Sequence, residues 1–252
     1  MRDSHYGYDL GVKALGSKLF VVGAELSDHA PRDYRVDVTA MRDFDGIEFK
    51  TPVTFFVGEN GSGKSTIIEA LAVAAGFNQE GGSKNFRFET VRREDEAEQP
   101  LFFHITRSSR YPSDGYFLRA ESFFNVATEI DRLGVTRGYG GVSLHKQSHG
   151  EAFLALLLNR FLGDGLYILD EPEAALSPTR QLTLLARIND LVHLGSQFLI
   201  ATHSPIVMAY PGATILSLDD GMREIAYEET EHYRVTRDFL NHRKKMLDEL
   251  MS

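Results

Sequence analysis

The sequence has 252 residues, of which 42% are hydrophobic and 25% are charged, and these proportions exclude a disordered or collagen-like chain. It contains no cysteine, which excludes disulfides, thiolate metal sites and a cysteine nucleophile. The formal net charge of −9 excludes a surface that is basic all over and lowers the expectation of nucleic-acid binding, while a local basic patch stays open.

No run approaches the roughly 20 apolar residues of a membrane-spanning helix. The first ten residues also lack the apolar core of a secretory signal, so we expect a cytoplasmic protein. Since α/β domains often exceed two hundred residues, we predict one domain over residues 1–252.

The first half alternates β-rich runs with turn signals, which predicts strands at 18–26, 34–39, 46–50 and 53–58. A glycine-rich loop follows, and then an alanine-rich helix that ends near Gly76. The polar residues 77–100 predict an exposed excursion. Further strands are expected at 101–107 and 115–120.

The second half begins with helical spacing over 122–133, a glycine-rich loop and a helix over 151–161, which predicts a helical lobe at about 121–160. The apolar run 166–170 is typical of a central parallel strand covered on both faces. A helix from Thr179, a second apolar strand from Gln197, a hairpin and an amphipathic helix over 233–250 complete the chain.

Residues 58–65 have the pattern G-x-x-x-x-G-K-S between a predicted buried strand and a predicted helix. Glycines there let backbone N–H groups turn inward around phosphates, Lys64 would reach the outer phosphates, and Ser65 would place its hydroxyl on Mg²⁺. The alternative is a glycine-rich turn without function, which the strand–loop–helix context disfavours. The loop residues expected to bind nucleotide are Gly58, Glu59, Asn60, Gly61, Ser62, Gly63, Lys64, Ser65 and Thr66.

Asp170 and Glu171 close the apolar run 166–170 at the strand end, where ligands of open α/β sheets bind. We expect Asp170 to hold Mg²⁺ and Glu171 to act as the general base that orients or deprotonates the attacking water. A solvated turn is the alternative. His203 follows the second apolar strand and would sense the γ-phosphate; a lone strand-end histidine is more often structural, but here it follows two other motifs in order.

The segments GENGSGKST, ILDEPEAALS and LIATHSP resemble the Walker A, Walker B with D-loop, and switch-histidine segments of ABC-type ATPases. The DEPEAALSP form resembles the soluble branch with the chromosome-maintenance and RecF-like DNA-repair ATPases, and most of all small stand-alone bacterial ATPases of the predicted AAA family. The resemblance covers residues 34–218 and implies ATP and Mg²⁺ as cofactors and hydrolysis of ATP to ADP and phosphate.

The same resemblance implies a signature segment at the start of a helix, and QSHGE at 147–151 is the match, with His149 in place of the usual glycine. In the family this segment contacts the nucleotide of the opposite protomer, which implies an ATP-dependent homodimer in which Ser148 and Gly150 bind phosphate. An ordinary helix N-cap at Ser148 is the alternative, and the two roles are compatible.

Two family features have no clear match. The strand before residue 121 offers Arg119 and Glu121 but no Q-loop glutamine, and only position suggests Arg42 or Phe44 for adenine contact. We predict that the terminal helix packs on its own domain; partner docking or phosphate contact by its basic residues 243–245 stays open.

The expected fold is an α/β, P-loop, ABC-ATPase-like core with a mostly parallel sheet, an antiparallel β portion and a helical lobe. Above this chemistry two functions compete: action on DNA, and a nucleotide-controlled switch that regulates a partner protein in a defence or stress system. A transporter subunit ranks third because neither a glutamine loop nor a full signature is clear.

Overall fold

The computed structural model describes residues 17–27, 44, 46–79, 81–83, 103–119, 123–132, 134, 141, 143–219 and 221–252. The predicted strand at 34–39, Arg42 and Glu121 lie outside these residues.

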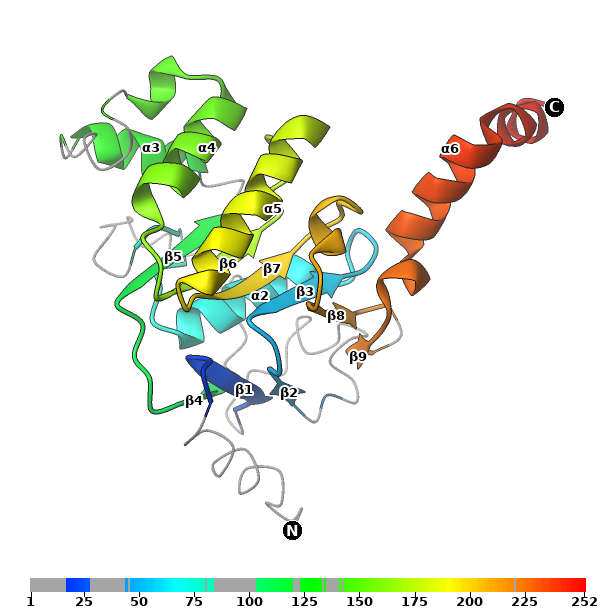
Figure 1. Ribbon diagram of the computed structural model, residues 1–252. Coiled ribbons are helices and arrows are strands. Elements are labelled where there is room, and N and C mark those ends of the chain that lie inside the picture. The colour runs from blue at the N-terminus through cyan, green and yellow to red at the C-terminus, as the bar shows by residue number, and fades with distance from the viewer. Residues whose placement is uncertain are drawn as a thin grey trace, which may run out of the picture.

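A mostly parallel sheet forms the centre of the molecule (Figure 1). Its neighbours are, in order, β5 (Asp114–Arg119), β6 (Gly165–Asp170), β7 (Gln197–Ala201), β3 (Val53–Val57), β8 (Thr214–Ser217) and β9 (Arg223–Glu224). The first five strands run parallel to one another, and β9 pairs antiparallel with β8 in the predicted hairpin. Every residue of β3, β6 and β7 is buried, as continuous apolar runs predict.

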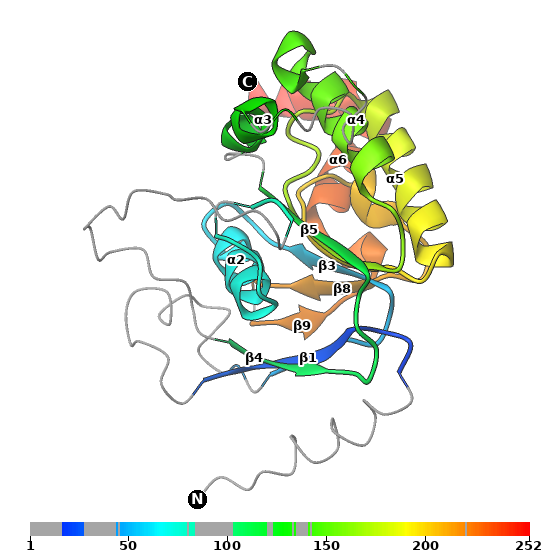
Figure 2. The same ribbon diagram turned by 90° about the vertical axis from the view of Figure 1, so that its left-hand side faces the viewer.

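A smaller antiparallel sheet lies below the first and orders β2 (Ile47–Glu48), β1 (Val21–Leu26) and β4 (Phe103–Arg107) (Figure 2). The buried side chain of Gln197 on β7 joins the two sheets. Its Oε1 accepts hydrogen bonds from the backbone N–H groups of Phe20 at 2.9 Å and Val21 at 3.0 Å, and its Nε2 donates to the Val21 carbonyl at 2.8 Å. The predicted mixed fold is therefore confirmed.

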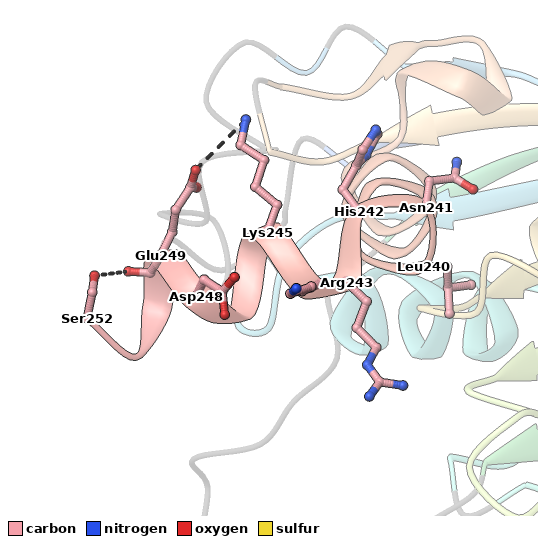
Figure 3. Close-up of a pocket in the computed structure, with 9 residues that line it drawn as sticks. Leu240, Asn241, His242, Arg243, Lys245, Asp248, Glu249 and Ser252 are labelled. Carbon is pink, nitrogen blue, oxygen red and sulfur yellow. Dashed lines mark hydrogen bonds and ion pairs between the residues drawn. The ribbon is translucent and has the colours of Figure 1, made fainter.

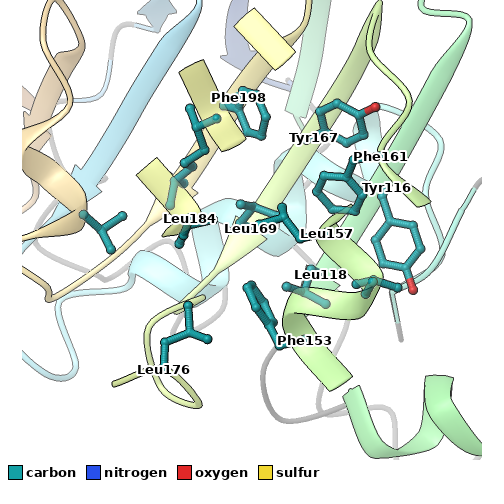
Figure 4. Close-up of a cluster of buried hydrophobic side chains, with 14 of the residues drawn as sticks. Tyr116, Leu118, Phe153, Leu157, Phe161, Tyr167, Leu169, Leu176, Leu184 and Phe198 are labelled. Carbon is teal, nitrogen blue, oxygen red and sulfur yellow. The ribbon is translucent and has the colours of Figure 1, made fainter. Parts of the chain in front are cut away.

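Helices cover both faces of the parallel sheet. The helix α2 (Lys64–Ala74) lies between the two sheets and shares one apolar core with them. On the other face α3 (Phe123–Arg132), α4 (His149–Arg160) and α5 (Pro178–His193) close a second core, shown in Figure 4, in which the rings of Phe161 and Tyr167 stack at 4.3 Å. Short 3₁₀ turns lie at Leu144–Lys146, Val207–Ala209 and Tyr227–Glu229.

The prediction of an exposed excursion from residue 77 is wrong where the structure describes it. Phe77 is 5% exposed and packs in the core around α2, and Ser83 is also 5% exposed. Gly82 forms a β-bridge with Phe117 on the main sheet. The polar composition of the whole segment hid these buried residues at its start.

The prediction that the terminal helix packs on its own domain is also wrong for all but its first turn, where His232 contacts His203. The helix α6 (Glu231–Leu250) has no buried residue and projects away from the sheets (Figure 1). It departs from helical geometry at His242, with φ −126°. An open hollow beside this bend is lined by α6 and the C-terminal residue alone; Figure 3 shows Arg243 and Lys245 extending from it, with Lys245 paired to Glu249 at 3.9 Å. None of the described helices is long and apolar enough to cross a membrane.

Candidate active site

The three sequence motifs meet at one edge of the main sheet. Since β6, β7 and β3 are adjacent and parallel, their carboxyl ends lie side by side. The glycine-rich loop follows β3, Asp170 ends β6, and His203 follows β7. The structure therefore brings together the residues expected to bind and hydrolyse a nucleotide.

The glycine-rich loop turns into α2 through backbone conformations that favour glycine. Gly61 has φ +82° and Gly63, the N-cap of α2, has φ +97°. Lys64 is only 4% exposed. Its ammonium lies inside the loop, where it donates to the carbonyls of Gly58 at 2.9 Å and Glu59 at 2.8 Å. The loop thus holds a cation at its centre and directs the N-terminus of α2 toward the same place.

Burial lowers the pKa of Lys64, and the carboxylates of Glu171 and Asp219 oppose that shift. A buried ammonium surrounded by carbonyl oxygens is costly unless an anion accompanies it. The loop is therefore suited to receive a strongly anionic ligand such as a phosphate chain.

The oxygens expected to hold Mg²⁺ are neighbours. The hydroxyl of Ser65 donates to Oδ1 of Asp170 at 3.2 Å, and Asp170 is 5% exposed. In the described part of the chain no cluster of at least three histidine, cysteine or acidic residues could form a metal cage. One hydroxyl and one carboxylate fit Mg²⁺, which usually keeps several waters and takes its remaining ligands from substrate phosphates.

Glu171 and His203 face each other above the strand ends. Oε1 of Glu171 lies 3.3 Å from Nε2 of His203, and the Glu171 side chain is 40% exposed. Glu171 has φ +48°, a conformation that is uncommon for glutamate and that clusters at functional sites. Burial lowers the pKa of His203 and the positive charge of Lys64 adds to this shift, while the carboxylate of Glu171 opposes it, so the fold favours the neutral imidazole.

Two carboxylates at the site were not identified from the sequence. Oε1 of Glu173 accepts hydrogen bonds from the backbone N–H groups of His203 at 2.6 Å and Ser204 at 3.2 Å, which holds the loop after β7 in place. Burial raises the pKa of Glu173. Oδ1 of Asp219, after β8, accepts from the N–H of Glu59 at 2.8 Å and supports the glycine-rich loop. The position of Glu173, two residues after Glu171, was a sequence signal for its role. Only the strand order reveals the role of Asp219.

The signature segment forms the N-terminus of α4. Ser148 is the N-cap and forms a capping box with Glu151, whose carboxylate accepts from the Ser148 N–H at 3.0 Å. A Cβ on Gly150 would lie 2.6 Å from the carbonyl oxygen of Ala175, so close packing against the segment before α5 requires glycine. Both residues therefore have a structural role, and their contact with nucleotide stays a prediction.

The remaining candidates lie apart from these motifs. Arg119 ends β5 and pairs with Glu69 of α2 at 3.1 Å. The ring of Phe44 packs edge-on against Phe103 at 5.6 Å, on the small sheet. These contacts give Arg119 and Phe44 structural roles. They do not support a role in nucleotide binding for either residue.

Two family models match the sequence. One, described as an AAA domain, matches residues 37–144 and contains the glycine-rich loop. The other, described as "AAA domain, putative AbiEii toxin, Type IV TA system", matches residues 132–209 and contains Asp170, Glu171 and His203.

The chain is similar to ABC transporter G family member STR2 of Medicago truncatula, with 26% identity over 196 residues that make up 67% of this chain but 26% of that protein. Among solved structures, an ATP-binding subunit of an ABC transporter aligns over 91% of this chain and 99% of its own, with 17% identity and a TM-score of 0.48. The SMC head domain from Thermotoga maritima aligns over 82% of this chain and 100% of its own, with 16% identity and a TM-score of 0.43.

Proposed function

We propose that this chain, an ABC-type ATPase nucleotide-binding domain, binds ATP at the carboxyl edge of its parallel sheet and hydrolyses it in an ATP-dependent homodimer. The observation that carries the proposal is the meeting of Lys64, the Ser65–Asp170 pair and the Glu171–His203 pair at that edge. Its ATPase chemistry agrees with the AAA-domain families matched by the sequence.

The residues divide the work of phosphoryl transfer, in which positioning and charge stabilisation supply most of the catalysis. The loop amides and Lys64 bind the phosphates and offset the negative charge that develops on them. Ser65 and Asp170 hold Mg²⁺, which supplies further charge neutralisation when it is bound. Glu171 orients or deprotonates the attacking water, and His203 contacts Glu171 from the next strand.

The homodimer rests on the signature segment. The N-terminus of α4 offers backbone N–H groups and the positive end of a helix dipole, which favour phosphate. We place Ser148 and Gly150 of one protomer on the nucleotide held by the other, so that each site is complete only in the dimer.

The Glu171→Gln variant tests this function because it removes the base while it keeps the shape of the side chain. We expect turnover to fall by about 100-fold or more. The variant should retain ATP and accumulate as a dimer in light scattering with ATP and Mg²⁺. A monomer under those conditions would contradict the dimer, and unchanged turnover would contradict the role of Glu171.

A second function above the ATPase chemistry, a nucleotide-controlled switch that acts on a partner protein, is favoured over action on DNA by the net charge of −9 and by the toxin–antitoxin description of the second matched model. The ATPase rate with and without linear duplex DNA, at low and at raised salt, separates the two. An indifferent rate supports the switch; salt-sensitive stimulation supports DNA action.

A further inference from the structure

The first turn of α6 reaches the candidate active site although the rest of the helix projects into solvent. Nε2 of His232 lies 2.9 Å from Nδ1 of His203, and the two rings meet at an angle of 64°. A hollow of about 380 Å³ separates this turn from Glu59 and Asn60 of the glycine-rich loop, with both histidines in its lining. The terminal helix therefore touches the residue expected to sense the γ-phosphate.

The start of α6 is held in place by contacts of its own. Thr230, the N-cap residue, is 1% exposed and donates to the Tyr227 carbonyl at 2.7 Å. The hydroxyl of Tyr227 donates to the carbonyl of Pro205 at 2.8 Å, in the segment that follows His203. The contact between His203 and His232 thus joins two segments that are each held in place by other hydrogen bonds.

The hydrogen bonds around His203 select one tautomer. Nε2 of His203 faces a carboxylate oxygen of Glu171 at 3.3 Å, so a lone pair on this nitrogen would face another acceptor. The neutral ring therefore carries its proton on Nε2 and has a lone pair on Nδ1. His232 must then donate its Nε2–H to that lone pair.

Resting on the proposed ATPase function, we propose that His232 is a positioning residue for hydrolysis: it fixes the tautomer and orientation of His203, and so links the exposed helix α6 to turnover. Without the donor from His232, His203 is free to move its proton to Nδ1 or to rotate its ring. The N–H directed toward Glu171 is then lost in part of the molecules. Binding of ATP, which depends on the loop around Lys64, is unaffected.

The test compares three single variants. We expect His232→Ala to lower kcat about tenfold, as loss of a residue that orients a catalytic histidine does, and to leave KM within about twofold. His232→Gln, which places an amide donor near the lost nitrogen, should restore most of kcat. His242→Ala is the matched control, because this second histidine of α6 is exposed and its ring hydrogen-bonds to the backbone carbonyl of Asp238 in its own helix.

A double-mutant cycle shows whether His232 acts through His203. Adding His232→Ala to His203→Ala should cause no further loss of kcat. Independent, multiplying losses would overturn the proposal, and so would equal kcat values for His232→Ala and His242→Ala in a chain whose wild type hydrolyses ATP.

Nitrogen-15 NMR of the imidazoles at pH 7.5 gives an answer that does not depend on ATPase activity. We expect the His203 signals of the wild type to report the Nε2–H tautomer. In His232→Ala the same signals should move toward the values of a mixture of the Nδ1–H and Nε2–H tautomers. A wild-type His203 with its proton on Nδ1 would overturn the proposal. A wild type that consumes no ATP but shows the expected tautomer would overturn the proposed function and leave the hydrogen bond standing.

Discussion

The two edges of the parallel sheet both hold charged side chains, but they use them differently. At the amino edge Asp114 is surrounded by donors: Arg160 at 2.7 Å, the hydroxyl of Tyr167 at 2.7 Å and the backbone N–H of Leu162 at 3.1 Å. At the carboxyl edge Lys64 donates within its own loop, to the carbonyls of Gly58 and Glu59 and to the hydroxyl of Ser62 at 3.5 Å. The side chain of Glu171 is 40% exposed. A closed network stabilises the fold, whereas an open one leaves charge for a ligand.

The pKa shifts follow the same division. Burial alone would raise the pKa of Asp114, but hydrogen bonds from Tyr167 and Leu162 lower it overall, so the folded state favours the carboxylate. Burial lowers the pKa of Lys64, so the folded state disfavours the ammonium. The charge at the amino edge therefore supports stability, and the charge at the carboxyl edge opposes it until an anion binds.

The largest effect is expected for Lys64→Ala. Loss of the ammonium should lower kcat/KM for ATP by about 1,000-fold, because Lys64 is the one cationic residue among loop residues 58–66. The free energy of unfolding should stay the same or rise, since a buried charge is removed. Steady-state ATPase kinetics measure kcat/KM, and denaturant unfolding measures the free energy of unfolding. Calorimetric titration measures the affinity for ATP, and an unchanged affinity would refute the site.

Asp114→Ala should have the opposite profile. It removes the carboxylate that pairs with Arg160 and Tyr167, which should lower the free energy of unfolding by about 3 kcal/mol. At 25 °C the folded fraction should keep its ATPase rate, because Asp114 lies at the far ends of β5 and β6. Denaturant unfolding together with the ATPase rate checks this; a rate loss like that of Lys64→Ala would break the distinction between the edges.

Acid should remove the difference in the free energy of unfolding between wild type and Asp114→Ala. The pKa of Asp114 is lowered in the folded state, so its stabilisation is fully present above the unfolded pKa of about 4. It is lost as the pH falls through the lower folded value. Urea unfolding from pH 7 to pH 2 should show a constant gap above about pH 4 that narrows below it; a gap that widens in acid would contradict the assigned sign.

Ser148→Ala is expected to give the smallest effect and separates two N-caps. Ser148 caps α4 and Ser177 caps α5, so Ser177→Ala is the matched control. Each of the two variants should lose about 1 kcal/mol of stability. Only Ser148→Ala should also weaken the ATP-dependent dimer of the Glu171→Gln variant in light scattering. Equal dimer formation by Ser148→Ala and Ser177→Ala would show that Ser148 acts as a helix N-cap and does not contribute to the dimer.

The carboxyl edge was predictable because its motifs each consist of consecutive residues. The pattern around Lys64, the acidic pair after 166–170 and the histidine after Gln197 need only the rule that parallel strands end at one edge. The amino edge was not predictable: Asp114, Arg160 and Tyr167 come from separate elements, and nothing local marks them as partners.

The same distinction explains what else the sequence left out. Asp219 and His232 reach the site from segments far along the chain, through contacts that only the folded arrangement creates. The amphipathic pattern of 233–250 predicted a helix correctly, but amphipathicity does not say what covers the apolar side chains, and α6 has no buried residue. Polar composition likewise concealed the buried Phe77.

The most direct test of the central claim, that the carboxyl edge is an ATP-hydrolysing site, is steady-state phosphate release from ATP by wild type, Lys64→Ala and Asp114→Ala at 25 °C with Mg²⁺. We predict release by wild type and by folded Asp114→Ala, and loss of release by Lys64→Ala. Equal rates for wild type and Lys64→Ala, or no release by any of the three, would contradict the claim.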